Sequence, residues 1–172
     1  MRPLKKLTLS ALLAALGVTL LYVGSLFELI DLSVVAIVSL LVVFAQLELR
    51  SPYQWMTYIA TALLAVLLLQ NRFAAYAYAL FGGLYPILKY YFEHLPRLFA
   101  WGIKLVAFNL MLGGVYAVSA WLFAGAFFPV GNLLYGMWAL CNFAFVLYDL
   151  LLTRVVILYI VVLRKRIERF LR

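Results

Sequence analysis

The sequence contains little of what most catalytic and metal-binding sites are made from. Its 172 residues include one cysteine, one histidine and six acidic residues. Cys141 lies in an apolar run and cannot form an intrachain disulfide, and no cysteine and histidine residues have the spacing of a metal site. His94 stands beside Pro96 and Arg97, which is typical of a solvated loop. Because phosphate loops and activated nucleophiles are also lacking, we expect no enzyme activity, no cofactor and no metal.

Charged residues are scarce as well, at 12% of the chain, whereas hydrophobic residues make up 69%. A soluble domain of this size cannot bury that much apolar surface, because a compact globule covers only part of its chain. Lipid must therefore surround the fold. The formal net charge of +8 comes from basic residues at the ends of apolar segments. This placement indicates membrane topology and anionic lipid headgroups rather than nucleic acid.

Charged residues and helix breakers divide the apolar sequence into six segments. A helix needs about 20 apolar residues to cross a hydrocarbon core of about 30 Å. These runs are too long and too uniformly apolar for barrel strands, and backbone groups in lipid must be satisfied within the segment. We therefore predict an all-α integral membrane protein, a single bundle of six transmembrane helices over residues 1–172. The predicted spans cover approximately 7–27, 32–48, 53–70, 73–92, 99–124 and 132–155.

The fifth and sixth spans are separated by a turn rather than by charge. Residues 105–148 contain no charged side chain and would extend about 66 Å as one helix, so they must fold back. The breakers Gly125, Pro129 and Gly131 predict the turn. The last apolar run is longer than the hydrocarbon core is thick, so it either tilts steeply or its end leaves the membrane and lies along the inner surface. We expect residues 156–172 to form a basic helical tail at the cytoplasmic surface.

The basic residues also predict the orientation of the chain. Of the fourteen lysine and arginine residues, twelve fall on one side, Arg72 falls on the other, and Arg154 lies within the last helix. Cytoplasmic loops are enriched in lysine and arginine, so both termini are predicted to be cytoplasmic. The twelve are Arg2, Lys5, Lys6, Arg50, Lys89, Arg97, Lys104, Arg164, Lys165, Arg166, Arg169 and Arg172.

Small residues in the first helix form pairs four positions apart. Ala11 and Ala15 make one pair, and Ser10 and Ala14 make another. Such pairs leave a shallow groove that lets a second helix approach closely, which is how helices associate in lipid. The groove serves either packing within this chain or docking of a partner.

The fourth helix contains Gly82, Gly83 and Pro86 near its middle. The proline ring clashes with the carbonyl of the residue four positions earlier, so a kink or break is predicted. Broken helices at membrane depth often line a binding site, although ordinary kinks also occur.

Asp149 and Arg154 are the ionisable residues expected at membrane depth, where such groups usually face protein or water. At five residues apart they point about 140° away from each other on a helix. Lys89 or Lys104 is therefore the expected partner of Asp149, and Glu48 that of Arg154. A structural brace and a coupling role both remain open.

Polar and aromatic residues gather in the predicted outer half. A small ligand with ring and polar groups would suit such a lining, whereas an aromatic belt at the membrane interface explains tryptophan and tyrosine without any ligand. The candidate ligand-binding residues are Tyr76, Tyr78, Trp121, Asn132, Tyr135, Trp138 and Asn142.

The chain resembles the substrate-binding S components of energy-coupling factor transporters, which take up vitamins and metal ions in prokaryotes. The resemblance rests on size, six helices with both ends inside, and the opening sequence LTLSALLAAL of residues 7–16. Members carry an Ala-x-x-x-Ala motif on the first helix, which falls here on Ala11 and Ala15. The resemblance implies capture of a vitamin-like nutrient at the cell membrane. It also implies docking of a transmembrane coupling subunit, which works with cytoplasmic ATPases, at the alanine pair.

Two other interpretations stay open. The bacterial rod-shape-determining membrane proteins are similar in size and helix arrangement, and a non-catalytic scaffold of that kind would need no ligand pocket. A small lipid-handling protein would instead use Arg154 and the basic tail to meet lipid phosphates. An open, polar outer cavity would favour the transporter subunit, and a cavity filled by tyrosine and phenylalanine would favour the scaffold.

Overall fold

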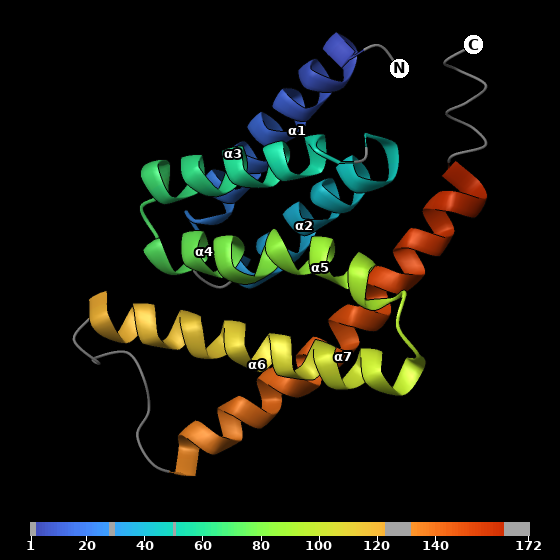
Figure 1. The fold of residues 1–172 in the computed structure, drawn as a ribbon. Helices are drawn as coiled ribbons and strands as arrows, with labels where there is room; N and C mark the ends of the chain where they lie inside the picture. The colour runs from blue at the N-terminus through green and yellow to red at the C-terminus, as the bar shows by residue number, and fades with distance from the viewer. Residues whose placement is uncertain (1–2, 28–29, 50, 123–131, 164–172) are drawn as a thin grey trace. The chain divides into compact units, whose positions relative to one another are not determined.

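The computed structural model describes residues 3–27, 30–49, 51–122 and 132–163 (Figure 1). Helices joined by short connections account for the described residues, and no strand occurs among them. The all-α prediction is therefore confirmed for this part of the chain. The chain divides into an N-terminal unit, Met1–Phe128, and a C-terminal unit, Pro129–Arg172. Each unit is described by itself.

Three helices open the N-terminal unit: α1 (Pro3–Gly24), α2 (Asp31–Glu48) and α3 (Tyr53–Leu68). The break before α3 falls at Ser51 and Pro52, where proline suits a turn or the start of a helix. Helix α3 ends because Leu69 adopts an extended backbone, with φ of −73° and ψ of 134°.

The fourth predicted span is not one regular α-helix. It consists of α4 (Arg72–Ala77), the π-helix η2 (Tyr78–Gly82) and α5 (Leu84–Phe92). Asn71 caps α4, because its side chain accepts a hydrogen bond from the backbone N–H of Phe73. Helix α6 (Arg97–Leu122) follows after a short turn. The C-terminal unit contains α7 (Asn132–Leu158) and the π-helix η3 (Tyr159–Leu163).

The two ends of the N-terminal unit are fastened by polar contacts. At one end, the Lys6 ammonium lies 3.4 Å from the Leu49 carbonyl oxygen at the end of α2 and 5.7 Å from the ring centroid of Tyr53. At the other end, the side chain of Asn71 donates a hydrogen bond to the carboxylate of Asp31. The start of α1 therefore adjoins the α2–α3 turn, while the starts of α2 and α4 meet (Figure 1).

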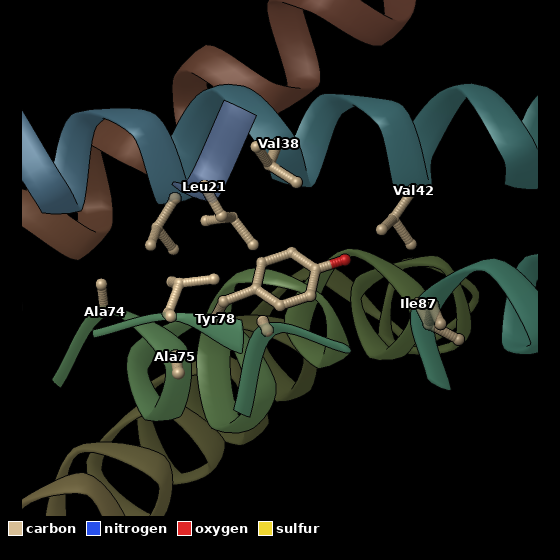
Figure 2. Packing of buried hydrophobic residues seen from close by; sticks show 10 residues of the cluster. Leu21, Val38, Val42, Ala74, Ala75, Tyr78 and Ile87 are labelled. Carbon is tan, nitrogen blue, oxygen red and sulfur yellow. The ribbon is translucent and has the colours of Figure 1, made fainter. Parts of the chain in front are cut away.

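The core of the N-terminal unit is built around Tyr78. Figure 2 shows its ring reaching from η2 toward Leu21, Val38 and Val42 of α1 and α2. Ala74 and Ala75 place α4 close to the same cluster, since their short side chains allow a near approach. A smaller cluster of Leu13, Ala45 and Leu49 packs between the start of α1 and the end of α2.

Among the residues that the structure describes, four helical segments are long and apolar enough to cross a membrane: Pro3–Gly24, Asp31–Glu48, Leu98–Val118 and Leu133–Val161. The apolar helix α3, Tyr53–Leu68, is shorter. The predicted turn at 125–132 lies outside the described residues except for Asn132 at the start of α7, and so do residues 164–172 of the predicted basic tail.

Candidate functional site

The two small-residue pairs of α1 lie on different faces of the helix. Ser10, Ala14 and Gly17 are buried. A Cβ atom added to Gly17 would lie 3.2 Å from Thr61 Cγ2 of α3 and 3.2 Å from Val38 Cγ1 of α2. Small side chains on this face thus bring α1, α2 and α3 into close contact.

The second pair, Ala11 and Ala15, is exposed. Thr8 and Thr19 are exposed on the same side, and their hydroxyls donate hydrogen bonds to the Leu4 and Ala15 carbonyl oxygens of the same helix, at 3.0 and 2.9 Å. At the helical repeat of 100° per residue, Ala15 lies near the middle of the exposed face, and Ala11 lies nearer its edge, beside the buried Val18. We call residues Thr8, Ala11, Ala15 and Thr19 the outer face of α1.

The predicted ligand-binding residues of the N-terminal unit lie in three different environments. Tyr78 is fully buried in the core, Tyr76 is half-buried, and Trp121 is 84% exposed near the end of α6. Full burial gives Tyr78 a packing role in the N-terminal unit (Figure 2).

The remaining predicted ligand-binding residues belong to the C-terminal unit. Tyr135 is 74% exposed, and Trp138 and Asn142 are half-buried. The Asn142 amide donates a hydrogen bond of 2.9 Å to the Trp138 carbonyl oxygen, one turn earlier in α7. Asn132 begins α7, and its side chain lies outside the described residues. A common lining formed by all seven residues stays a prediction.

The π-helix η2 sits where the sequence predicts a kink. The backbone N–H of Gly83 donates to the Tyr78 carbonyl oxygen, five residues earlier, at 2.8 Å. Gly82 and Gly83 allow close packing, because an added Cβ would lie 2.5 Å from Val35 Cγ1 or 2.4 Å from Tyr58 Cδ2, respectively. Pro86 lies in the first turn of α5, where a missing N–H is tolerated.

One side chain that contacts η2 was not predicted from the sequence. The hydroxyl of Tyr58, on α3, donates a hydrogen bond of 2.7 Å to the Ala79 carbonyl oxygen of η2. Its ring also meets Trp55 edge-on, with the centroids 6.1 Å apart. Since a tyrosine in an apolar helix is common, no local pattern distinguishes Tyr58 from other aromatic residues.

A cluster of ionic side chains joins α5 to α6. The ammonium groups of Lys89 and Lys104 lie 3.2 and 3.5 Å from the same oxygen of Glu93. Both lysines are buried, at 5% and 6% exposure, whereas the Glu93 side chain is 45% exposed. Lys104 also lies 5.5 Å from the ring centroid of Trp101. Both lysines are charge partners predicted from the sequence, for Asp149. Glu93 was not predicted as a partner, although its spacing from Lys89 is that of a helical ion pair.

The two ionisable residues predicted in the last helix differ in exposure. Asp149 is 1% exposed, and Arg154 is exposed. The predicted pairing of Asp149 with Lys89 or Lys104, and that of Glu48 with Arg154, would join residues of different units, and both stay predictions.

No protein-family model, curated protein or solved structure matches this chain.

The described residues offer helix-packing surfaces rather than reactive groups. Among them, no three histidine, cysteine, aspartate or glutamate side chains gather where a metal could bind. A shallow groove of about 650 Å³ runs along α6, and its lining is apolar: Leu98, Phe99, Gly102, Ile103, Val106, Ala107 and Leu110. The best-defined candidate for recognition is therefore the outer face of α1.

Proposed function

We propose that the chain is a multi-pass membrane protein with six membrane-crossing segments and both termini on the cytoplasmic side. The four long apolar helices support membrane crossing. The charge distribution supports the orientation, because Lys5 and Lys6 lie in the first turns of α1 beside the α2–α3 turn, whereas Arg72 begins α4 at the opposite end. The prokaryotic plasma membrane is the location that the resemblance to S components implies.

Within that membrane, we propose that the chain is the nutrient-binding subunit of an uptake transporter similar to the energy-coupling factor type. The single observation that carries this proposal is the exposure of Ala11 and Ala15. In S components this pair is the surface that docks the transmembrane coupling subunit. Had the pair packed inside the bundle, the surface that the proposal requires would have been unavailable.

The buried face of α1 illustrates how such docking would work. Ser10, Ala14 and Gly17 bring α1 against neighbouring helices at van der Waals distance. Lipid tails are as apolar as the helix surface, so the hydrophobic effect does not drive helices together in a membrane. Helices in lipid associate instead through close packing of this kind. Ala11 and Ala15 present the same residue class at the same spacing to the outside. A helix of the coupling subunit is the occupant that we propose.

Purification in mild detergent from the native cell, followed by mass spectrometry, tests this function. We expect a transmembrane coupling subunit and two ATPases to be retained, together with a small vitamin-like molecule. Recovery of cell-wall or division proteins without an ATPase would contradict the transporter function. Washing at high salt is the appropriate control, because adventitious partners of this basic chain are held by charge.

A second candidate function is a non-catalytic membrane scaffold. Tyr78 and Tyr85 are both fully buried, so large aromatic side chains occupy the centre of the N-terminal unit. The apolar groove along α6 also offers no polar group to orient a nutrient. A purified protein that retains partners but no small molecule would support the scaffold over the transporter subunit.

A further inference from the structure

The π-helical hydrogen bonding of η2 leaves the Ala79 carbonyl without its usual backbone donor, and a side chain of α3 donates to it instead. In an α-helix, the N–H of Gly83 would bond to the carbonyl of Ala79, four residues earlier. Here it bonds to the carbonyl of Tyr78, at 2.8 Å. The Ala79 carbonyl accepts instead from the hydroxyl of Tyr58, at 2.7 Å. The Tyr58 hydroxyl of α3 therefore takes the place of the Gly83 N–H at the Ala79 carbonyl, and this part-buried acceptor keeps a hydrogen-bond partner.

We infer that η2 can convert between π-helical and α-helical hydrogen bonding, and that the Tyr58 hydroxyl stabilises the π-helical state. We call this convertible segment the joint. In the alternative state, the Gly83 N–H returns to the Ala79 carbonyl and the turn becomes α-helical. The Tyr58 hydroxyl then gives up its place at Ala79. The Ala79 carbonyl is satisfied in both states, by the Tyr58 hydroxyl in one and by the Gly83 N–H in the other. The Tyr78 carbonyl, which loses the Gly83 N–H, accepts from the Gly82 N–H in the α-helical state, so no carbonyl of the turn is left without a donor.

The glycines explain why Tyr58 reaches the joint. A Cβ atom at Gly83 would lie 2.4 Å from Tyr58 Cδ2 and 3.1 Å from Tyr78 Cζ. A Cβ atom at Gly82 would lie 2.5 Å from Val35 Cγ1. These distances are too short for any larger residue without movement of a ring or of α2. Glycine at both positions thus brings η2 against α2 and α3 and allows the tyrosine hydroxyl to approach the backbone.

Conversion of the joint would move α5 and α6 against the rest of the N-terminal unit. Winding the extra residue of the π-turn into a regular α-helix rotates the following helix by about 100° and shifts it by about 1.5 Å. Phe81 stacks on Tyr85 and meets Phe108 of α6 edge-on, with both centroid separations at 5.4 Å. These aromatic contacts carry the motion to α6. Tyr78 and the alanines of α4 stay anchored in the core (Figure 2).

Amide hydrogen exchange of the protein in lipid nanodiscs tests the joint through Tyr58→Phe. This substitution keeps the ring beside Gly83 and removes only the hydroxyl. We expect the amides of residues 79–84 to exchange roughly two- to tenfold faster, as loss of one hydrogen bond predicts. The control is Tyr53→Phe in the first turn of α3, which removes a hydroxyl from the same helix away from Ala79. Unchanged exchange at 79–84, or an even rise across α1–α6, would overturn the inference.

A variant lacking Leu80 distinguishes a register switch from simple loosening. Its deletion removes one residue from the π-turn, so the segment can become α-helical while the flanking helices keep their orientation. In that background the Gly83 N–H bonds to the Tyr78 carbonyl and the Leu84 N–H bonds to the Ala79 carbonyl, as in a regular α-helix. Tyr58→Phe should therefore leave exchange at 79–84 unchanged within twofold. If Tyr58→Phe accelerated exchange as much as it does in the full-length turn, the hydroxyl would act elsewhere and the joint would be disproved.

Discussion

Asn71 fastens the start of α2 to the start of α4 by using both ends of its side-chain amide. The Nδ2 group donates a hydrogen bond to the Asp31 carboxylate in the first turn of α2. The Oδ1 atom accepts from the backbone N–H of Phe73, at 3.0 Å. The Asp31 carboxylate also lies where the partial positive charge of a helix N-terminus favours an acid. One polar side chain thereby secures two loop–helix junctions at the same end of the N-terminal unit.

Replacing Asn71 with alanine should lower the free energy of unfolding by about 1–3 kcal/mol. The change removes a helix cap and a hydrogen bond to a buried carboxylate. Unfolding in mixed micelles by sodium dodecyl sulfate, followed by circular dichroism, measures the loss. Gln70→Ala, at the exposed neighbouring position, should change stability by less than about 0.5 kcal/mol. Equal effects at the two positions would contradict the dual role of Asn71.

Gly83→Ala should be destabilising by about 1–3 kcal/mol, because the new methyl group overlaps the ring of Tyr58. The matched control is Gly102→Ala in α6, where an added Cβ meets nothing within 4 Å. There alanine should stabilise the helix by up to about 1 kcal/mol through its higher propensity. Thermal unfolding of both variants, monitored by tryptophan fluorescence, gives the comparison. Destabilisation of similar size at both glycines would mean that helix α3 does not constrain Gly83.

The ion cluster between α5 and α6 predicts coupling between Glu93 and Lys104. Their charged atoms are 3.5 Å apart, and Glu93 is partly exposed, so solvent weakens the pair. A double-mutant cycle with Glu93→Gln and Lys104→Met should give a coupling free energy of about 0.5–1 kcal/mol in unfolding experiments. The same cycle with Lys5→Met, an exposed residue of α1, should give none. Additive effects of Glu93→Gln and Lys104→Met would show that the ion pair is not maintained in the membrane.

The helical segments could be predicted from the sequence because their signals are local. Residues 70–72, with the sequence QNR, interrupt an apolar run, and the structure ends α3 at Leu68 and starts α4 at Arg72. The glycines and proline of the fourth segment likewise indicate an irregular helix at the correct place. They do not indicate a π-turn, because the donor that stabilises it, Tyr58, lies twenty-one residues from Ala79.

The site features that escaped prediction depend on which helices become neighbours. Spacing alone does not show which of the pairs Ser10/Ala14 and Ala11/Ala15 is buried, since the residues of each pair are four positions apart. The difference between them arises only when α3 packs on α1 and covers the face that contains Gly17. The contact of Asp31 with Asn71 joins residues forty positions apart and also follows from packing. Such pairings carry no signal in a single sequence.

The central proposal is that the outer face of α1 docks a partner helix. The most direct test compares Ala11→Trp and Ala15→Trp with Leu16→Trp, which places the same side chain at an exposed position about 100° around the helix from Ala15. Each variant is purified from the native membrane, its folded state is checked by gel filtration and thermal unfolding, and the retained coupling subunit and ATPases are quantified.

We expect the alanine variants to lose more than about 90% of the retained ATPase, which corresponds to a penalty of about 1.4 kcal/mol or more. The Leu16→Trp protein should retain the wild-type amount, and all three should unfold within a few degrees of the wild type. Undiminished retention of ATPase by folded Ala11→Trp and Ala15→Trp proteins would contradict the account.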